Sequence, residues 1–299
     1  MSKKVMVFGG SGFLGSHVAD CLVEKGYDVS IYDIKKSSYL TEGQKMIVGD
    51  VTDYDKVIEV LKGFDIVYNF SGIADIQEAS ENPLNVVKLN ILGNTNILEA
   101  CRINKVKRFI FASSLYVYGN LGSFYRSSKQ ACELIIEDYQ KKFGLDFIIL
   151  RYGSLYGDRA TGFNPLRDFI EQAIKKGKII RKGNGEEIRE YINVVDAARS
   201  SVEVIERGFK NEYMMISGNQ SMKIKDMLEM IKEMMKGKIK IEYNTPALAD
   251  EHYGITPYYF QPKVAKKYVL DSYYDLGEGI LSLIYKTHEE LLNERENGY

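Results

Sequence analysis

Short apolar runs alternate with longer segments of helical periodicity through the first half of the chain. The runs are rich in valine, isoleucine and phenylalanine and are almost wholly apolar, which is typical of strands covered on both faces of a sheet. They lie at residues 4–8, 29–32, 45–48, 65–70, 107–113 and 146–152. This alternation predicts an α/β fold with a doubly wound parallel sheet and helices on both of its faces.

The pattern changes after Tyr152, where a loop-rich stretch precedes shorter strand and helix patterns. We expect these to form a smaller C-terminal α/β lobe. Residues 190–208 combine a strand pattern with a helical one, and this segment is expected to return to the first domain. The predicted boundaries are residues 1–158 with the return segment 187–217 for the first domain, and residues 159–186 and 218–299 for the lobe.

Composition excludes several classes of function. The 40 basic and 41 acidic residues nearly cancel and form no basic stripe, which gives no support for nucleic-acid binding. No apolar run approaches the roughly 18 residues of a membrane span and no apolar signal region precedes the first strand, so no membrane partner and a cytoplasmic location are expected. Cys21, Cys101 and Cys132 are expected to be buried hydrophobes. The three scattered histidines favour neither a hydrolase nor a metal site.

Gly10, Gly12 and Gly15 form the pattern G-x-G-x-x-G between the first strand and the first helix. Such glycines allow a tight turn and a close approach of the backbone to a diphosphate, whose charge is attracted by the free amides at the start of the helix. The motif is weak alone, but its place between a strand and a helix indicates dinucleotide binding. The alternative is a glycine-rich turn without a ligand.

Asp33 ends the second strand, 18 residues after the last motif glycine, close to the spacing at which an acidic residue bonds the adenosine ribose hydroxyls. A carboxylate there repels a 2′-phosphate, so NAD is favoured over NADP, although Lys35 and Lys36 follow closely and would tolerate a phosphate. Asp50 and Val51 follow the third strand and are placed to meet the adenine ring. A helix cap is an equally good interpretation of the turn at residues 49–53.

Ser114, Tyr125 and Lys129 are the residue types from which a nicotinamide-dependent alcohol dehydrogenase site is built, and only ten residues separate the serine from the tyrosine. Tyr125 and Lys129 share one face if their segment is helical. A tyrosine base at pH 7 needs a pKa about three units below its free value near 10, or about 4 kcal/mol. One ammonium about 4 Å away supplies roughly that amount at an effective dielectric of about 20. The Ser114 hydroxyl, at the carboxyl end of a strand, can hold the reacting oxygen.

The tyrosine-lysine spacing alone carries little weight, because it also occurs at Tyr32/Lys36 and at Tyr259/Lys263. The pair at Tyr125 gains its significance from the strand before it and from the nucleotide-binding start upstream. Without them, a surface pair would be the expected interpretation.

A series of motifs follows in order along the chain. It comprises Gly9-x-x-Gly12-x-x-Gly15, Gly49-Asp50-Val51, the run from Asn90 to Ala100, the run from Ser113 to Gly119, Tyr125-x-x-x-Lys129 and the run from Leu150 to Gly157. This series resembles the extended short-chain dehydrogenases/reductases, in particular the NAD-dependent epimerase/dehydratase family that acts on nucleotide sugars. The resemblance implies a Rossmann-like NAD-binding domain, a nucleotide-sugar-binding C-terminal lobe and a homodimer formed through residues 85–103 and 130–143. Alternatively, the apolar faces of these two helices belong to the domain core.

The resemblance also implies roles for single residues. Catalysis falls to Ser114, Tyr125 and Lys129. Contacts with NAD fall to Gly9, Gly12, Phe13, Leu14, Asp33, Asp50, Val51, Phe70, Ser71, Gly72, Asn90, Tyr125, Lys129 and Tyr152. Contacts with the substrate fall to Ser114, Tyr116, Asn164 and Arg189, with Arg189 binding the diphosphate. An arginine after a glycine turn is otherwise a solvated charge, and Asn164 could equally cap the next helix.

Departures from the family pattern concern the substrate. Residues 249–259 lack an evident second diphosphate-binding arginine, and His252 stands near its place. The interval before Tyr125 is short, and Phe124 stands where proline is frequent in the family. We therefore hypothesise a pocket that takes a larger or unusually substituted hexose or heptose.

The expected reaction is NAD-dependent oxidation at C4 of a nucleotide-diphospho-sugar, with Tyr125 removing the hydroxyl proton. Reduction of the 4-keto sugar on its other face would make the enzyme a 4-epimerase, which we favour. Release of the keto sugar would make it a 4-dehydrogenase, for example of a GDP-heptose, or a reductase with tightly bound NAD. Leu115 and Tyr116 stand where 4,6-dehydratases carry acidic residues, so dehydration is disfavoured. A non-catalytic NAD-sensing regulator is the alternative from another class.

Overall fold

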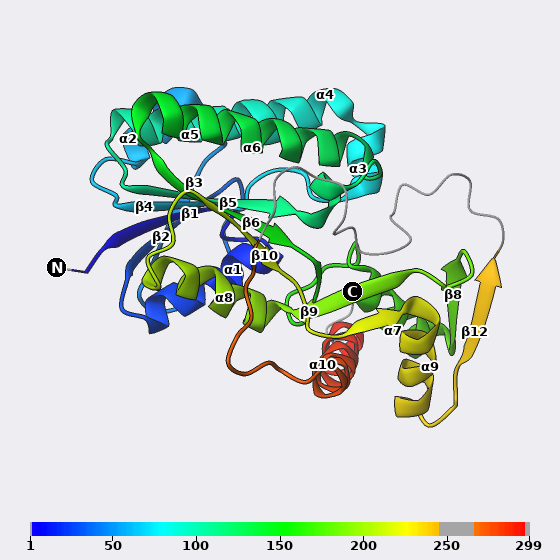
Figure 1. The fold of residues 1–299 in the computed structure, drawn as a ribbon. Helices are drawn as coiled ribbons and strands as arrows, with labels where there is room; N and C mark the ends of the chain where they lie inside the picture. The colour runs from blue at the N-terminus through cyan, green and yellow to red at the C-terminus, as the bar shows by residue number, and fades with distance from the viewer. Residues whose placement is uncertain (1, 245–265, 297–299) are drawn as a thin grey trace.

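The structure of the protein is a computed structural model that describes residues 2–244 and 266–296. An eight-stranded sheet with the order β13-β10-β6-β5-β4-β1-β2-β3 forms its centre (Figure 1). Neighbouring strands in this sheet run parallel. The strands are β1 (Lys4–Phe8), β2 (Asp28–Asp33), β3 (Gln44–Val48), β4 (Ile66–Asn69), β5 (Arg108–Ser114), β6 (Asp146–Tyr152), β10 (Glu212–Ile216) and β13 (Lys266–Lys267). Every strand predicted from the apolar runs is present, and the predicted doubly wound α/β fold is confirmed.

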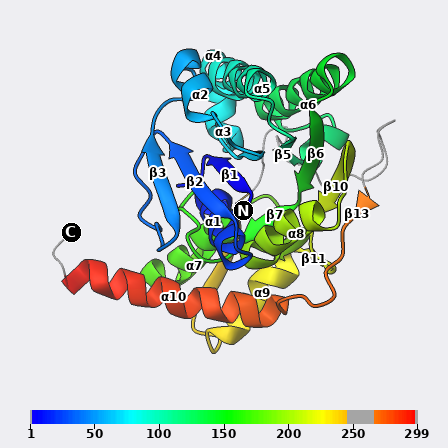
Figure 2. The ribbon, with the colours of Figure 1, turned by 90° about the vertical axis from the view of Figure 1, so that its left-hand side faces the viewer.

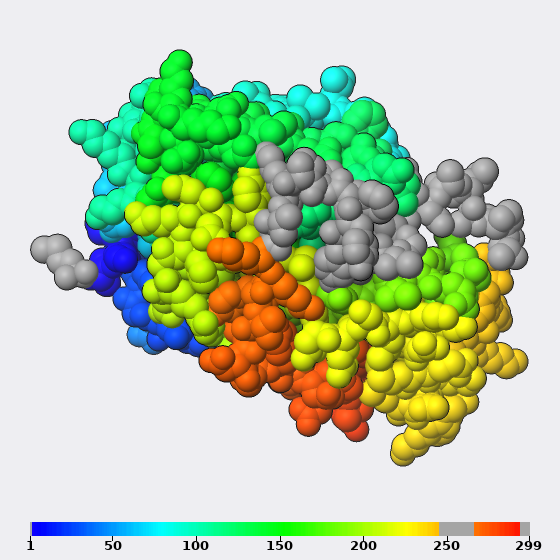
Figure 3. All heavy atoms as spheres, viewed as in Figure 1, coloured from blue at the N-terminus to red at the C-terminus, as the bar shows by residue number. Residues whose placement is uncertain are grey.

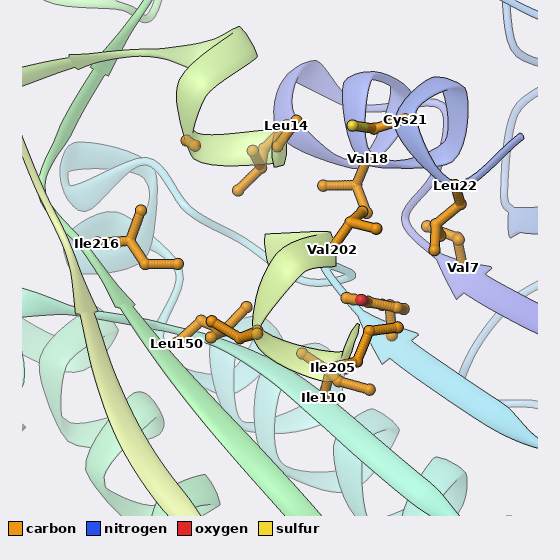
Figure 4. Packing of buried hydrophobic residues seen from close by; sticks show 14 of the residues in the cluster. Val7, Leu14, Val18, Cys21, Leu22, Ile110, Leu150, Val202, Ile205 and Ile216 are labelled. Carbon is orange, nitrogen blue, oxygen red and sulfur yellow. The ribbon is translucent and has the colours of Figure 1, made fainter. Parts of the chain in front are cut away.

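Helices cover both faces of this sheet, as Figure 2 shows. One face carries α1 (Phe13–Glu24) and α8 (Val194–Glu206), and the other carries α2 (Tyr54–Val60), α5 (Gly93–Ile103) and α6 (Ser123–Phe143). In the core on the first face, Val18 and Leu22 of α1 pack near Val202 and Ile205 of α8 (Figure 4). Because both faces are buried, the strands between them are almost wholly apolar.

The helix layer on the α6 side is continued by α3 (Ile76–Glu81), α4 (Pro83–Val86) and η1 (Val87–Leu92), which leads directly into α5. The segment η1 is a π-helical turn, in which backbone hydrogen bonds skip one residue more than in an α-helix. Helix α6 ends at Gly144, whose φ of +72° is the left-handed conformation that glycine adopts at helix ends.

The second lobe lies to the lower right of the large sheet in the views of Figures 1 and 3. Its strands form a three-stranded sheet of order β11-β9-β7 and a parallel pair, β12 and β8. Its elements are β7 (Ser154–Tyr156), α7 (Pro165–Lys176), β8 (Lys178–Lys182), β9 (Ile188–Asn193), β11 (Ser221–Lys223), α9 (Ile224–Met234), β12 (Lys240–Asn244) and α10 (Leu276–Glu296). Three helices of this lobe share one apolar core. It contains Leu166 and Ile170 of α7, Met227 and Ile231 of α9, and Ile280 of α10.

The chain crosses between the two lobes several times. Helix α8 packs against α1, and β10 pairs with β6 at one side of the large sheet. Strand β9 belongs to the stretch that the sequence assigned to the first domain, yet it pairs with β7 and β11. Residues 268–275 run back across α8, where the amide of Tyr274 donates to Asp196 at the start of that helix, 2.7 Å away (Figure 3).

Cys21, Cys101 and Cys132 are free and buried, as predicted. Burial raises the pKa of the Cys132 thiol to about 12, so this group stays neutral near pH 7. Within residues 2–244 and 266–296, no helix has the length and apolar character needed to cross a membrane.

Candidate active site

The glycine-rich loop between β1 and α1 packs closely against neighbouring backbone and leaves no room for side chains at Gly9 and Gly15. Gly9 has a φ of +74°, and a Cβ atom there would lie 2.7 Å from the amide nitrogen of Ser71 in the loop after β4. A Cβ atom on Gly15 would overlap the carbonyl oxygen of Gly9. Gly12 precedes α1 and supplies no side-chain cap to the first amides of the helix, at Phe13 and Leu14. The loop therefore forms a cradle that fits a diphosphate at the positive end of α1.

Asp33 lies against this loop at the end of β2. Its carboxylate accepts hydrogen bonds from the backbone amide of Ser11 at 3.0 Å and from that of Lys35 at 3.3 Å. The hydroxyl of Ser11 donates to the carbonyl oxygen of Lys35, which closes the turn. The negative charge thus stands directly beside the cradle, as a contact with the adenosine ribose requires.

Asp50 and Val51 follow β3 on the same edge of the sheet. The carboxylate of Asp50 accepts from the amide and the hydroxyl of Thr52, 2.8 and 2.9 Å away. The cap of α2 is Asp53, which accepts from the amide of Lys56, so the turn does cap a helix, through Asp53 and not through Asp50. Val51 is buried, and its carbonyl oxygen accepts from the side chain of Asn96 at 3.0 Å.

Asn90 fixes the loop that follows β4. Its side chain accepts from the amide of Ile73 at 2.7 Å, and it donates to the carbonyl oxygen of Ile73 and to the hydroxyl of Ser128, each at 3.0 Å. Gly72 has a φ of +116° beneath this side chain, and Phe70 and Ser71 precede it. Asn90 lies in the π-helical turn, and its carbonyl oxygen accepts from the thiol of Cys132 on α6, 3.1 Å away. Asn90 therefore joins the loop to the helix of Tyr125 and Lys129.

Lys129 lies on α6 directly above the end of β5. Its ammonium donates to the carbonyl oxygen of Ala112 at 2.7 Å and stands 4.8 Å from the ring centre of Phe111 and 5.7 Å from that of Tyr125. The side chain is 7% exposed. Burial lowers the pKa of Lys129 to about 8, because a charged ammonium is costly to keep away from water.

Ser114 and Tyr116 lie where β5 ends and the next short helix begins. Ser114 is the last residue of β5, and its hydroxyl accepts from the amide of Tyr116 at the start of the short helix η2 (Leu115–Tyr118). The rings of Tyr116 and Tyr125 meet edge to face, with centres 6.2 Å apart. The structure therefore brings the predicted Ser114, Tyr125 and Lys129 to one place at the carboxyl edge of the sheet.

The other described tyrosine-lysine pair has a different environment. Tyr32 lies within β2, where its hydroxyl donates to the carbonyl oxygen of Asp50 at 3.0 Å, and Lys36 follows the end of that strand. These two residues cannot share a helix face. The pair at Tyr259 and Lys263 falls outside the described residues, as do His252 and the stretch 249–259.

Two predicted contact residues use their side chains within the fold. The hydroxyl of Tyr152 pairs with that of Ser201 on α8 at 2.6 Å, so this ring belongs to the core under the sheet. Asn164 accepts from the amide of Arg167 at 3.2 Å and donates to the carbonyl oxygen of Leu155 at 2.8 Å. The helix-cap interpretation of Asn164 is therefore confirmed.

Arg189 lies on β9 in the second lobe, in register with Met222 of β11. Its side chain is buried, and one guanidinium nitrogen donates to the carbonyl oxygen of Ile188 at 3.0 Å. The alternative interpretation of Arg189 as a solvated surface charge is therefore wrong.

Sequence reasoning assigned no role to two charged residues behind Lys129. Glu133 lies one turn further along α6, and Arg151 lies on β6. Both are buried and paired with each other. An arginine within an otherwise apolar strand and a glutamate four residues after Lys129 were the signals that could have found them.

The fold and the site define a dinucleotide-binding α/β protein with serine, tyrosine and lysine gathered at the carboxyl edge of its sheet. Residues 5–217 match the model of the NAD dependent epimerase/dehydratase family. The chain belongs to this family, as its motifs predicted, and the expectation of NAD as the cofactor is confirmed.

The similar proteins cover more than one reaction. A putative UDP-glucose 4-epimerase of Methanocaldococcus jannaschii is 29% identical over 94% of this chain and 97% of its own length. A dTDP-D-glucose 4,6-dehydratase of Mus musculus is 25% identical over 78% of this chain and 74% of its own. A UDP-N-acetylglucosamine 4-epimerase of Methanobrevibacter ruminantium, solved with UDP-N-acetylmuramic acid, has the same fold, with a TM-score of 0.85, 24% identity and coverage of 97% and 99%.

Proposed function

We propose that the protein is an NAD-dependent 4-epimerase of a nucleotide-diphospho-sugar, with a UDP-sugar as the substrate to test first. The observation that carries this proposal is the position of the buried Lys129 ammonium. It lies beside the ring of Tyr125, one helical turn away, and close to Ser114 at the edge of the sheet. The similarity to proteins named as UDP-sugar 4-epimerases supports the choice of reaction and of nucleotide.

Tyr125 is the base in this mechanism and takes the proton from the hydroxyl at C4 of the sugar. The ammonium of Lys129 favours the phenolate form of Tyr125 because opposite charges at this distance attract in a partly buried site. The Ser114 hydroxyl donates to the same sugar oxygen and orients it. NAD, when bound, would supply the acceptor for the hydride at C4 and then its donor to the opposite face of the 4-keto sugar, which inverts that carbon. Tyr125 then gives its proton back to the oxygen at C4.

The glycine-rich loop and the residues around it would hold NAD. The amides at Gly12, Phe13 and Leu14 would hold the diphosphate of NAD, and Asp33 would accept from the ribose hydroxyls. Asp50 and Val51 would lie beside the adenine. The backbone of the loop after β4, which Asn90 holds, and the backbone at Tyr152 would line the rest of the cofactor.

On the substrate side, we assign Arg189 to the diphosphate and Tyr116 to the wall of the sugar pocket. Asn164 caps α7 with both ends of its amide, so we now assign it only an indirect part in that pocket. Leu115 is fully buried next to Val117 and cannot move a proton, which disfavours dehydration.

A product analysis tests the reaction. The purified protein is incubated with UDP-, GDP- and dTDP-hexoses and with a GDP-heptose, and the products are identified by NMR and mass spectrometry. We expect the C4 epimer at unchanged mass with no net NADH. Loss of two hydrogens with stoichiometric NADH would instead establish a dehydrogenase, and loss of water a dehydratase.

Tyr125→Phe is the matched control for this assay. It keeps the ring against Tyr116 and removes only the hydroxyl, so we expect turnover to fall by about 10² to 10⁴ while NAD still binds. Wild-type protein that binds NADH but converts no nucleotide sugar would point to a regulator.

We also propose that the protein forms a homodimer through α5 and α6. These helices run along the outside of the helix layer in Figure 1, and Ile103, Leu134 and Phe143 on them are exposed. Light scattering of the wild type and of Leu134→Arg tests this proposal. A monomer in both samples would contradict it.

A further inference from the structure

A buried ion pair links the helix of Tyr125 and Lys129 to two strands of the sheet. Glu133 of α6 is 3% exposed and Arg151 of β6 is 1% exposed. The guanidinium binds the carboxylate with two parallel hydrogen bonds, Nε to Oε1 at 3.0 Å and Nη2 to Oε2 at 2.7 Å. The hydroxyl of Ser113 on β5 donates to Oε1 as well, at 2.6 Å. One side chain of α6 is thereby fixed to both strands.

The two strand residues stand in direct register with each other. Ser113 of β5 is the partner of Arg151 on β6, and Ser113 immediately precedes Ser114. One residue earlier on β5, the carbonyl oxygen of Ala112 receives the ammonium of Lys129. Helix α6 is therefore attached to the end of β5 at two successive turns, through Lys129 and through Glu133.

Two aromatic rings lie close to the guanidinium of Arg151. The ring centres of Tyr118 on η2 and Tyr213 on β10 each lie 4.6 Å from Cζ of Arg151. Arg151 can therefore change neither its rotamer nor its partner without disturbing three elements. The planar guanidinium makes two parallel hydrogen bonds to one carboxylate and lies close to two rings. A lysine cannot reproduce this geometry.

Stability alone is a poor explanation for this arrangement. Removing two charges from water is costly, and a buried ion pair is often no more stabilising than an apolar pair of similar volume. Its best-attested advantage is that it enforces one register between elements. Here the register that it enforces is that of α6 against β5, which sets where Tyr125 and Lys129 stand relative to Ser114.

We propose that Glu133 and Arg151 are positioning residues that hold Tyr125 and Lys129 beside Ser114, and that Glu133 supplies a negative charge one turn behind the Lys129 ammonium. The roles of Tyr125, Lys129 and Ser114 in this statement rest on the proposed function. The roles of Glu133 and Arg151 rest on the contacts above.

The charges around Lys129 single out Glu133. The titratable groups that face or flank the ammonium are Tyr125, Cys132 and Glu133 on α6, with Tyr118 of η2 and Arg151 of β6 behind the carboxylate. From β5 it meets the carbonyl oxygen of Ala112 and the ring of Phe111. Burial lowers the pKa of Lys129, whereas the charge of Glu133 raises it. Cys132 is a neutral thiol near pH 7, so the opposing charge on α6 is that of Glu133.

The first readout is the pKa of Lys129, followed by NMR of protein labelled with ¹³C at lysine Cε and assigned with Lys129→Arg. We expect Glu133→Gln to lower this pKa by about one unit, since an opposing charge at this range is worth roughly that much. The matched control is Glu137→Gln, one turn further along α6, where the carboxylate accepts from Tyr213. An unchanged Lys129 pKa in Glu133→Gln would overturn the electrostatic part of the proposal.

The second readout is turnover of the nucleotide sugar. Glu133→Gln is expected to lower kcat at least tenfold and to change KM less than twofold, because the pair orients the reacting groups and leaves the binding surfaces untouched. Glu137→Gln should keep kcat within twofold. Equal kcat values in the two variants would overturn the positioning role.

Glu133→Gln leaves the buried guanidinium of Arg151 without its opposing charge, and that variant can fail to fold. The double variant Glu133→Gln with Arg151→Met removes both charges and avoids this cost. It should fold, and it should keep both the lowered kcat and the lowered Lys129 pKa. Recovery of wild-type values in the double variant would show that the pair does neither. If the wild type converts no nucleotide sugar, the proposed function fails, but the Lys129 titration still decides the role of Glu133.

Discussion

The ammonium of Lys129 lies 2.7 Å from the carbonyl oxygen of Ala112, two residues before Ser114 on the neighbouring strand. This contact fixes the charge at the end of β5 before any ligand arrives. It also fixes Tyr125, because the two residues occupy successive turns of one helix and the ammonium stands 5.7 Å from the tyrosine ring. The positive charge is preformed, and it is held where a phenolate would need it.

Replacement of Lys129 tests how much this buried charge lowers the free energy of unfolding. In the folded chain its pKa is about 8, against an ordinary value of 10.5. The unfolded chain therefore binds more protons between these pH values, so the contribution of Lys129 to the free energy of unfolding rises with pH in that window. At pH 7 the lowered pKa corresponds to a loss of about 3 kcal/mol from the free energy of unfolding. The hydrogen bond to Ala112 offsets about 1 kcal/mol of that loss.

Lys129→Met should accordingly raise the free energy of unfolding at pH 7 by about 2 kcal/mol and abolish turnover. The gain should fall to near zero at pH 10, because the destabilisation shrinks to about 1 kcal/mol as the pH approaches 10.5 and the bond to Ala112 offsets that remainder. Urea unfolding at both pH values measures it. Lys62→Met, at an exposed position, is the control and should show no such pH dependence. An equal gain at pH 7 and pH 10 would refute the explanation.

Local sequence was enough to predict most of the main sheet and the group at its edge. Six of its eight strands were predicted from apolar runs, whereas β10, which begins with Glu212, and β13, which consists of two lysines, were not. Tyr125 and Lys129 are four residues apart on one helix, so their meeting needs no information from distant parts of the chain. Ser114 follows because the ends of parallel strands meet along one edge.

The contacts that the sequence did not predict depend on distant segments. Tyr152 ends an apolar strand, but its hydroxyl is taken by Ser201, because α8 returns from the second lobe and packs beneath β6. Likewise, the partner of Glu133 lies on β6 and could not be found from helix spacing. Two carboxylates near the start of α2 were equally suitable caps by composition, and only the turn geometry selects Asp53 over Asp50.

The cofactor preference is tested at Asp33. Asp33→Asn keeps an oxygen that can accept from the amide of Ser11 but removes the negative charge beside the cradle. We expect the affinity for NADP to rise about tenfold and that for NAD to fall a few-fold, since a charged acceptor is worth roughly 1.5 to 3 kcal/mol. Fluorescence titrations with NADH and NADPH measure both. Asp28→Asn, at the other end of β2, should change neither affinity. An undiminished preference for NADH in Asp33→Asn would remove Asp33 from the ribose site.

Gly122 connects the backbone to the sugar pocket. It precedes α6 with a φ of +99°, and a Cβ atom there would lie 2.6 Å from Cδ1 of Tyr116. Gly26 has a similar φ of +81° and open space around it, so Gly26→Ala is a matched control. Both substitutions should cost about 1 kcal/mol of stability from the backbone alone.

Only Gly122→Ala should displace Tyr116, and with it the edge-to-face contact on Tyr125. We therefore expect Gly122→Ala to lower kcat about tenfold, because a small misplacement of a reacting group has effects of this size. Gly26→Ala should retain wild-type kcat. Thermal unfolding and initial rates compare the two, and equal rates would rule out a role for the Tyr116 contact.

Asn164 and Arg189 are expected to have different roles, the first in capping α7 and the second in binding the diphosphate. Asn164→Ala removes the cap of α7 and should lower the free energy of unfolding by about 1 kcal/mol, with little change in the affinity for UDP. Arg189→Met removes a buried cation that can bind two phosphate oxygens at once, so it should weaken UDP binding at least tenfold. Calorimetric titration with UDP and urea unfolding of both variants distinguish the two effects. A loss of UDP affinity in Asn164→Ala that equals the loss in Arg189→Met would restore Asn164 to the phosphate site, because loss of a cap alone acts on stability and leaves the charges of the pocket in place.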